Sequence, residues 1–475
     1  MFARNARIPV TFVLILSFLT SFGAVCLASD RPFNLPRTER KVLPNGLVVV
    51  LMEKRDLPLI DFQLLVPAGS AEDPQNKEGL ANLTALLLRK GTKTKTARDI
   101  AEQVDFLGAE LSIDAREDRT VISLEVMSED AAFAAGLLAD LVRNPSFTQT
   151  EFDKEKQNVL ASLESDKDDV PRYASTGFRI FLLEEHPYAH PVKGYGESVA
   201  RIERSDAELF HQQVFHPKGA ILAVVGDFDA RKILELIEKS FLTWKAGARI
   251  SKRPVVEPPV KIEGRKVRIV DKPDATQTQL RIGNVSFARN SADYFPGLVS
   301  NSILGGVFSS RLMTELRVNR GLTYSVFSRF LPFRDGGIFT INTYTKTETA
   351  GEALRVILDE MDKLVSGGVS DDELEKVKNY LKGQFPLSLE TPEKIANLLL
   401  EVEFYGLPID YAAKFRQNVD SVTAENVAEI ARRYFDTADL AILALGKTVD
   451  ISPQLQAIGK IETVDMDWKP LGTTK

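Results

Sequence analysis

Cysteine and histidine are scarce in this chain, which has one cysteine, Cys26, and four histidines among 475 residues. A lone cysteine forms no internal disulfide and leaves no second thiol as a metal ligand. A proline follows His186 and another follows His190, so no helix presents these two rings on one face. His211 and His216 are five residues apart, which also separates them around a helix. We therefore expect loop or surface roles for all four histidines.

The chain also lacks a cluster of basic residues. Its 60 Lys and Arg residues are outnumbered by 66 Asp and Glu residues, which gives a formal net charge of −6. This balance argues against nucleic acid as a partner and against binding of the mature chain to an anionic membrane surface. With 44% hydrophobic and 27% charged residues, the composition is that of a soluble globular protein long enough for two or more domains.

The N-terminus departs from this globular pattern. Two arginines precede the apolar run Ile8–Leu19, and small residues follow up to Ala28 before a polar Ser-Asp pair. This order predicts a secretory signal, residues 1–28, and therefore an exported, periplasmic protein. Cleavage after Ala28 would also remove Cys26 and with it the only thiol. An uncleaved membrane anchor and a lipoprotein attached through Cys26 are the two alternatives.

An internal repeat with a period near 220 residues divides the chain into two similar halves. Three pairs of strings match in the same order at nearly one offset: Gln63-Leu64 with Gln279-Leu280, Glu151–Lys154 with Glu373–Lys376, and Ala220–Gly226 with Leu440–Gly446. Three prolines interrupt Lys252–Gly264, which we interpret as the linker. The predicted domains are residues 29–251 and 265–475, each large enough to bury its own core.

The periodicity of apolar residues alternates between strand and helix in both halves. Alternation typical of strands covers 48–51, 60–66, 111–115, 121–126, 280–287 and parts of 327–344. Helical periodicity covers 80–88, 96–108, 131–142, 150–163, 294–304 and 348–365, with capping signals at Thr96 and Ser370. Hairpins and helix pairs mixed in each half predict an α+β fold, in which each domain is a largely antiparallel sheet packed with helices.

The segment Gly79–Thr92 has the frame of an inverzincin helix but none of its metal ligands. Those enzymes carry His-x-x-Glu-His on one helical turn, where the two His side chains bind zinc and the Glu activates water. The corresponding positions here are Asn82, Ala85 and Leu86. An Asn amide is a poor zinc ligand, and Ala and Leu have no donor atom. We expect no metal at this helix.

The whole mature chain resembles the pitrilysin-type (M16) metallopeptidase family, in its short-chain branch similar to the processing peptidases. Several strings in order carry the resemblance: Leu43–Gly46, Pro67–Ser70, Gly79–Ala81, Lys90–Thr92, His186–Tyr188, Gly226-Asp227, Leu304–Leu312, Leu316-Arg317 and Gly321–Ser325. The resemblance implies the LuxS/MPP-like metallohydrolase type of fold in both domains. It also implies a third zinc ligand, a Glu, at the position of Ser162, so that ligand is lost as well.

Arg317 and Tyr324 are the chemically competent residues that the family's pattern retains. In the family an Arg/Tyr pair at this spacing lies in the C-terminal half and faces the zinc across a closed cavity. A guanidinium can hold a peptide carbonyl or carboxylate, and a phenol can donate a hydrogen bond to an oxyanion. Without that context the two residues would be an ordinary surface arginine and a half-buried strand tyrosine. Arg320, nearby, is expected to be only a solvated neighbour.

Gly305 and Gly306 allow two interpretations. A glycine pair here can serve a turn with positive φ, or it can belong to a substrate-contacting loop, since the family places a glycine-containing loop near the peptide channel.

Three functions follow from these features. In the first, the chain is the non-zinc subunit of a heterodimeric M16 peptidase, has no cofactor of its own, and supplies Arg317 and Tyr324 to a zinc-bearing M16 homologue that cleaves a peptide. In the second, it is a structural or peptide-binding protein without a catalytic role, as the core subunits of a respiratory complex have the same fold. The third, an independent peptidase with another mechanism, has no Ser/His/Asp or Cys/His arrangement to support it.

Overall fold

The computed structural model describes residues 36–245 and 256–471. The predicted signal, residues 1–28, and the first four residues of the predicted linker, 252–255, lie outside these ranges. Within the described ranges, no helix combines the length and apolar character needed to cross a membrane. The described residues form one compact unit.

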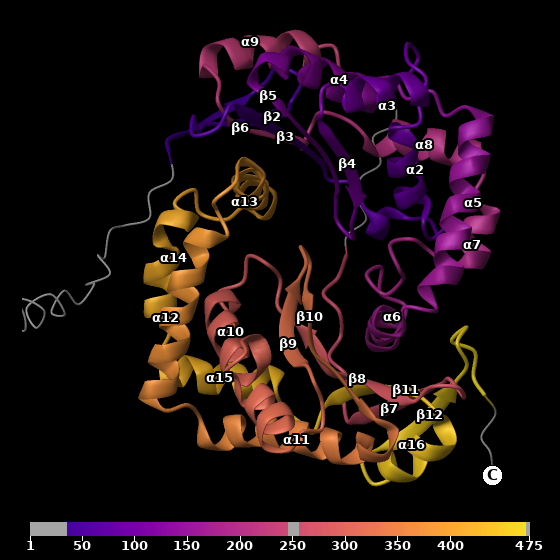
Figure 1. Ribbon diagram of the computed structural model, residues 1–475, viewed down its shortest axis with the longest axis vertical. Coiled ribbons are helices and arrows are strands. Elements are labelled where there is room, and N and C mark those ends of the chain that lie inside the picture. Colours follow the sequence, from indigo (N-terminus) through magenta and orange to yellow (C-terminus); the bar gives the residue numbers. More distant parts are fainter. Residues whose placement is uncertain (1–35, 246–255, 472–475) are drawn as a thin grey trace, which may run out of the picture. The chain divides into compact units, whose positions relative to one another are not determined.

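The first half of the chain folds into one six-stranded sheet with helices on both faces (Figure 1). Its strands are β1 (Thr38–Val42), β2 (Val48–Glu53), β3 (Leu59–Val66), β4 (Glu110–Ala115), β5 (Thr120–Met127) and β6 (Ile221–Gly226). Its α-helices are α2 (Leu80–Leu88), α3 (Ala97–Phe106), α4 (Ala131–Arg143), α5 (Gln149–Asp166), α6 (Val170–Leu183), α7 (Gly196–Arg201), α8 (Arg204–Val214) and α9 (Ala230–Phe241). Short 3₁₀ turns are η2 (Ser70–Glu72) and η3 (Ser128–Asp130).

The second half forms a second six-stranded sheet. Its strands are β7 (Arg265–Asp271), β8 (Gln277–Ser286), β9 (Val326–Pro332), β10 (Gly337–Lys346), β11 (Leu440–Gly446) and β12 (Lys460–Val464). Its α-helices are α10 (Tyr294–Asn301), α11 (Ala350–Gly367), α12 (Asp371–Leu387), α13 (Pro392–Tyr405), α14 (Tyr411–Asp420), α15 (Ala424–Tyr434) and α16 (Thr448–Leu455). Two π-helical segments, η4 (Ser302–Gly306) and η5 (Met313–Asn319), and the 3₁₀ turn η6 (Thr347–Thr349) complete it.

The two sheets repeat one strand order. The first runs β1-β2-β6-β3-β5-β4 and the second β12-β7-β11-β8-β10-β9. β2 and β6 are parallel, as are β7 and β11, while the β6-β3-β5-β4 and β11-β8-β10-β9 stretches are antiparallel. The outer strand beside the parallel pair differs: β1 is antiparallel to β2, and β12 is parallel to β7. The α+β fold is confirmed, with sheets that are mixed, although mainly antiparallel.

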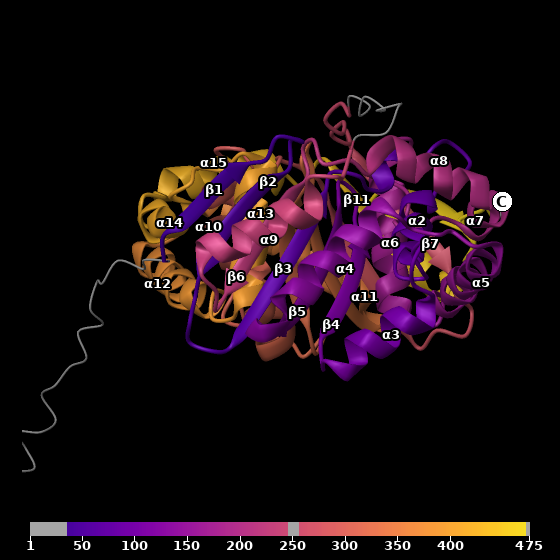
Figure 2. The ribbon, with the colours of Figure 1, turned by 90° about the horizontal axis from the view of Figure 1, so that it is seen from above.

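Each sheet has one face that is covered by helices of its own half. Helices α9, α4 and α3 lie over the first sheet, as Figure 2 shows from above. The side chains that face them alternate along each strand, such as Phe62 and Leu64 on β3, and both are fully buried. In the second half, α11 and α15 cover β8, and α16 packs against β7.

The other face of each sheet is packed by a helix from the opposite half. Helix α6, from the first half, lies against β8 and β11, and α13, from the second half, lies against β3 and β6. Phe178 and Phe181 of α6 share a buried cluster with Leu443 and Leu445 of β11. On α13, the carbonyl of Glu393 accepts a hydrogen bond from the Gln63 side chain on β3 (3.1 Å). The halves therefore exchange one helix each.

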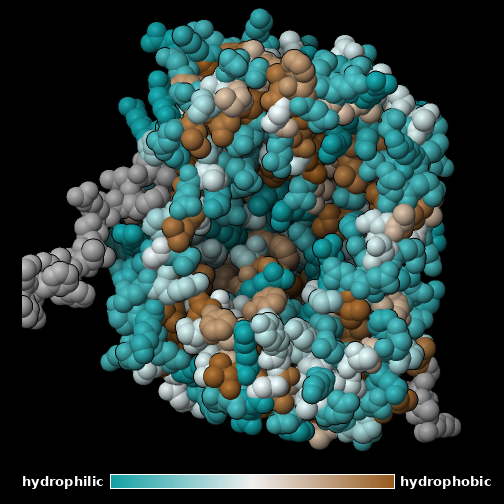
Figure 3. Space-filling view, in the orientation of Figure 1, coloured by the Kyte–Doolittle hydropathy of each residue, from teal (hydrophilic) through white to brown (hydrophobic). Residues whose placement is uncertain are grey.

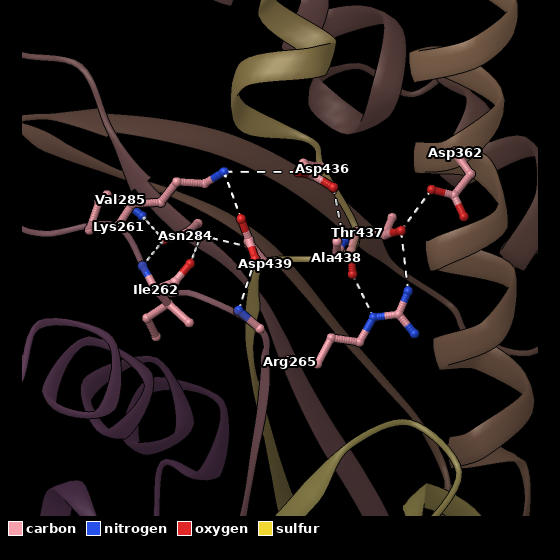
Figure 4. Close-up of polar contacts among 11 residues, drawn as sticks. Lys261, Ile262, Arg265, Asn284, Val285, Asp362, Asp436, Thr437, Ala438 and Asp439 are labelled. Carbon is pink, nitrogen blue, oxygen red and sulfur yellow. Dashed lines mark hydrogen bonds and ion pairs between the residues drawn. The ribbon is translucent and has the colours of Figure 1, made fainter.

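The described part of the predicted linker, residues 256–264, is anchored to the second half. Val256 and Ile262 are buried, and the Asn284 amide accepts a hydrogen bond from the Ile262 backbone (3.1 Å). Figure 4 shows this network, in which the carboxylate of Asp439 also accepts from the backbone of Gly264 (2.8 Å). These residues lead directly into β7.

The end of the described chain returns to α6. The Trp468 ring stacks on Tyr173 with 4.7 Å between centroids, the Tyr173 hydroxyl donates to the Met466 carbonyl, and Lys167 pairs with Asp467 (2.9 Å). Residues 465–471 therefore hold the second half to a helix of the first.

Candidate functional site

The helix that would carry the metal ligands is α2, and it is capped by a carboxylate. Gly79 precedes it with φ of 99°, a conformation that favours glycine. Asp73 accepts hydrogen bonds from the Gly79 and Ala81 backbone, both at 2.7 Å. Complete burial raises the pKa of Asp73 well above its usual value, although these two bonds oppose the shift. The observed limits of α2 match the predicted 80–88.

The three ligand positions on α2 offer one polar side chain. Asn82 is half-buried, Ala85 is 1% exposed, and Leu86 packs against the hydrophobic core of the first half. Only the Asn82 amide has a donor or acceptor atom. The helix is therefore regular and well packed, but its side chains do not suit zinc.

The position assigned to the third ligand is held by a hydrogen bond to a lysine. Ser162, on α5, accepts from the Nζ of Lys193 at 2.8 Å, and Lys193 also pairs with Asp166 at 2.7 Å. An ammonium group beside this position disfavours a metal cation there. Lys193 and Asp166 line a cavity of about 870 Å³ that extends to the tail at Trp468. Sequence reasoning missed Lys193, because no spacing rule links it to Ser162.

No zinc site forms elsewhere in the described ranges. They contain no group of three or more His, Cys, Asp or Glu side chains that could hold a metal ion. His186 contacts the Glu257 carbonyl through Nε2 (2.8 Å). His211 is buried in α8 against the Val142 carbonyl (2.9 Å), and burial lowers its pKa to about 4. The expectation of a surface or loop role was therefore wrong for His211, whose role is structural.

Arg317 and Tyr324 lie in direct contact. Arg317 is on the π-helical segment η5, and its Cζ is 4.3 Å from the centroid of the Tyr324 ring and 5.0 Å from that of Phe308. Tyr324 is 70% exposed and Phe308 68% exposed. A cation over an exposed ring contributes about 0.5–1 kcal/mol, which is enough to orient the guanidinium without burying it.

Neither functional group of this pair is used by the rest of the described chain. Arg317 forms no ion pair, and the Tyr324 hydroxyl forms no hydrogen bond, with any residue in the described ranges. Arg320 behaves differently, because its Nε contacts the Glu315 carboxylate at 3.2 Å. The two arginines, three residues apart in sequence, therefore differ in their contacts. The guanidinium of half-buried Arg317 and the exposed hydroxyl of Tyr324 are therefore available as hydrogen-bond donors.

Gly305 and Gly306 end the π-helical segment η4, and neither has a positive φ. The interpretation as a left-handed turn is therefore wrong. A Cβ on Gly305 would lie 2.6 Å from the Ser328 hydroxyl oxygen, so this glycine allows close packing of η4 on β9. Gly306 is exposed, two residues before Phe308. A role in substrate contact stays a prediction for both.

The degenerate metal positions and the Arg/Tyr pair belong to different halves. Helix α2 packs against α5 and α8, while η5 packs against α11 and β9. The Arg/Tyr pair therefore lies in a different half from the positions of the missing metal ligands.

Two family models match the chain. Residues 48–179 match the model described as Insulinase (Peptidase family M16), and residues 201–381 match the model described as Peptidase M16 inactive domain. An uncharacterized zinc protease of Mycobacterium leprae (strain TN) is 29% identical over 405 residues, covering 83% of this chain and 88% of that protein. A Helicobacter pylori protein named as a non-peptidase homolog is 24% identical, covering 85% and 92%.

A solved structure has the same fold. The peptidase M16 inactive domain from Pseudomonas fluorescens superposes with a TM-score of 0.81 at 28% identity, covering 87% of this chain and 98% of that one. The chains similar to this one thus include proteins named as zinc proteases and proteins named as inactive.

Proposed function

Because the chain belongs to the peptidase M16 family, we propose that it is the non-zinc subunit of a heterodimeric M16 metallopeptidase. In this proposal a homologous partner carries the zinc motif, and this chain supplies Arg317 and Tyr324. The observation that supports it most is the pairing of these two side chains at 4.3 Å, with their polar atoms unused by the described residues.

The chemistry of the pair suits the recognition of a peptide under hydrolysis. The Arg317 guanidinium holds a backbone carbonyl of the peptide through two N–H donors that converge on its oxygen. The Tyr324 hydroxyl donates a hydrogen bond to the oxygen that becomes negatively charged when water attacks. Contact between ring and guanidinium fixes their relative position before substrate arrives, which lowers the cost of ordering them.

In this proposal the partner supplies the metal, because the described ranges of this chain hold no group of three or more metal-ligating side chains. Asn82, Ala85 and Leu86 provide no zinc-binding set, and the Lys193 ammonium lies beside Ser162. The relative named as a non-peptidase homolog supports a protein of this fold without independent activity. We place the pair of subunits in the periplasm, on the basis of the signal predicted over residues 1–28.

Substitution of Tyr324 tests the proposal in the assembled complex. Tyr324→Phe should lower kcat of the zinc-bearing partner by a factor on the order of 10²–10³, the scale for loss of one oxyanion donor. Tyr380→Phe is the matched control, because Tyr380 is also an exposed tyrosine of the second half. Peptide cleavage is measured with both subunits at equal concentration, and assembly is checked by gel filtration.

Arg317→Lys tests the second group. It should also lower activity, because an ammonium cannot make the planar two-pronged contact, whereas Arg320→Lys should not. If both Arg317→Lys and Tyr324→Phe leave turnover unchanged, the chain is a scaffold. The alternative function, a structural or peptide-binding protein of the same fold, would then be favoured.

A further inference from the structure

A row of polar side chains crosses the face of the second sheet that α6 partly covers. Arg281 on β8 lies directly opposite Asn342 on β10, and Asn342 lies directly opposite Phe327 on β9. Arg329 is two residues further along β9, opposite Thr340. Residues opposite each other in a sheet share a face, and diagonal neighbours are within reach of long side chains. Arg281, Asn342 and Arg329 therefore belong to one surface.

Arg281 is a buried cation without a carboxylate partner. It is 3% exposed, and its five N–H groups donate to neutral acceptors: Ser175 Oγ, Gln279 Oε1 and the carbonyls of Pro171, Leu280 and Thr343. Two of these acceptors, Pro171 and Ser175, are on α6, so Arg281 holds the helix to the sheet. Its hydrogen bonds are satisfied, yet no described side chain neutralises its charge.

Arg329 and Asn342 add donors that nothing in the described ranges uses. Arg329 is an exposed residue on the edge strand β9, with its guanidinium 5.6 Å from the Phe327 ring and no ion pair. Asn342 is 3% exposed, and its Nδ2 has no hydrogen-bond partner. Burial lowers the pKa of Arg281 to about 10, and the charge of Arg329 adds to this effect. The cations repel each other, which an anion would relieve.

The internal repeat shows that the fold requires neither an arginine at the position of Arg281 nor an asparagine at that of Asn342. In the first sheet, Leu65 lies opposite Val121, and Val121 lies opposite Asp114. These are the positions that correspond to Arg281, Asn342 and Phe327, because Gln63-Leu64 aligns with Gln279-Leu280 in the same strand order. Two apolar residues thus serve in one half where an arginine and an asparagine stand in the other. An unpaired polar group in a sheet costs stability, so a ligand role accounts for it better than packing does.

We propose that Arg329 and Asn342, in the positive field of Arg281, bind a carboxylate of the peptide substrate. This inference rests on the proposed function, since it takes the peptide to lie along β9 from Tyr324. The hollow visible in Figure 3 lies over β9 and β10 in the orientation of Figure 1. Arg329 is five positions after Tyr324 along the chain, roughly 17 Å in extended backbone. The carboxylate would then lie about four or five residues from the bond that is cut.

Three fluorescein-labelled peptides of one neutral ten-residue sequence test this, with binding to the purified mature chain measured by anisotropy. The first has a free C-terminal carboxylate, the second is amidated, and the third is amidated but carries one internal Glu. We expect one of the two peptides that carry a carboxylate, the first or the third, to bind about 10-fold more tightly than the second, which carries none. A gain with the first identifies a peptide C-terminus, and a gain with the third identifies an acidic side chain.

Two variants identify the residues responsible for the difference in affinity between the peptides. Arg329→Gln should remove the difference between peptides, and Asn342→Val, which places in β10 the residue found at the corresponding position of β5, should reduce it. Arg320→Gln is the control and should keep the difference. Equal affinity for all three peptides, absence of binding to any of them, or a difference that survives Arg329→Gln would overturn the inference.

These outcomes are independent of the test of Tyr324. Loss of activity in Tyr324→Phe together with equal peptide affinities would keep the proposed function and refute the carboxylate site. Unchanged activity in Tyr324→Phe together with tighter binding of a carboxylate-bearing peptide would indicate a peptide-binding protein with no catalytic contribution.

Discussion

Lys193 is, at the scale of single residues, a second feature that disfavours a metal cation, beside the missing ligands on α2. Its ammonium donates to Ser162 and pairs with Asp166, so the space next to α5 already holds a positive charge. The loss of ligands at Asn82, Ala85 and Leu86 was readable from their side chains. The ion pair was not, because it joins residues that are close only after α5 and the loop at Lys193 have folded together.

Metal analysis provides the direct check. The mature chain, incubated with equimolar zinc and dialysed, should retain well below one zinc per chain, because no competent set of donors remains. Elemental analysis by mass spectrometry measures this. A partner with an intact zinc motif, treated in the same way, is the positive control. About one tightly held zinc per chain of this protein would contradict the prediction.

Asp61 should make stability depend on pH. Burial raises its pKa from 3.8 to about 7, with the charges of Glu125 and Glu393 adding to the shift and the Gln63 hydrogen bond opposing it. The folded state therefore keeps a proton that the unfolded chain releases. The contribution of this proton to the free energy of unfolding is complete below the pKa that Asp61 has in the unfolded chain. It is lost as the pH rises through about 7, the pKa in the folded state. The loss is on the order of 4–5 kcal/mol, at about 1.4 kcal/mol per pKa unit.

Urea unfolding of Asp61→Asn at pH 5 and pH 8 tests this dependence. The variant cannot ionise at this position, so its free energy of unfolding should fall less between the two pH values than that of the unchanged protein. Asp105→Asn, at an exposed position, should show the unchanged dependence. An equal fall in all three proteins would show that Asp61 titrates normally.

At the scale of elements, local sequence patterns predicted single helices and hairpins correctly, but no pattern predicted which distant segments pair. The Thr96 capping box, helix α2 and the β4-β5 hairpin follow from periodicity and turn residues within about 20 residues of chain, and the structure confirms them. The parallel pair β2-β6 joins segments far apart in sequence, which no local pattern records. The helix expected over 294–304 is α-helical only to Asn301 and continues as the π-helical η4.

Gly177 tests how the C-terminal tail is held to α6. A Cβ at this position would lie 2.1 Å from Cζ3 and 2.2 Å from Cη2 of Trp468. Gly177→Ala should therefore displace the indole from Tyr173 and lower the free energy of unfolding by about 1–3 kcal/mol, despite the better helix propensity of alanine. In a Trp244→Phe background, Trp468 is the only tryptophan, and its emission should shift to longer wavelength.

Gly383→Ala is the matched control for this substitution. Gly383 is also inside a helix, α12, but a Cβ there meets nothing within 4 Å. This change should raise stability slightly, by about 0.5–1 kcal/mol, and leave the emission unchanged. If both glycine variants behave alike, the Trp468 contact does not constrain the tail.

For residues 36–475 as a whole, the exchange of helices matters more than the division into halves. The sequence repeat predicted two similar units, and the two sheets do share their strand order. The repeat did not indicate that α6 would complete the packing of β8 and β11, or that α13 would cover β3 and β6. Such contacts depend on the complementarity of surfaces that are hundreds of residues apart in sequence. The linker expected at Lys252–Gly264 therefore joins halves that also share buried contacts.

The exchange predicts that the two halves unfold together. Trp244 belongs to the core of the first half, and Trp468 packs against the cluster that joins α6 to the second sheet. Urea unfolding followed in Trp468→Phe and in Trp244→Phe therefore reports each region separately, and the two curves should coincide. Phe178→Ala on α6 removes a side chain that is 2% exposed and should cost about 3–5 kcal/mol.

Substitutions in different halves distinguish coupled from independent unfolding of the two halves. If the halves are coupled, Phe178→Ala and Phe152→Ala, which lies in the core of the first half, should each lower the midpoint of both tryptophan signals. If the halves are independent, Phe152→Ala would shift only the Trp244 signal and Phe178→Ala only the Trp468 signal. Coupled unfolding would mean that Arg317 and Tyr324 keep their positions only while the first half, with its degenerate metal helix, remains folded. The degenerate half would then have a physical reason to persist without zinc, since α6 completes the sheet whose edge strand begins beside Tyr324.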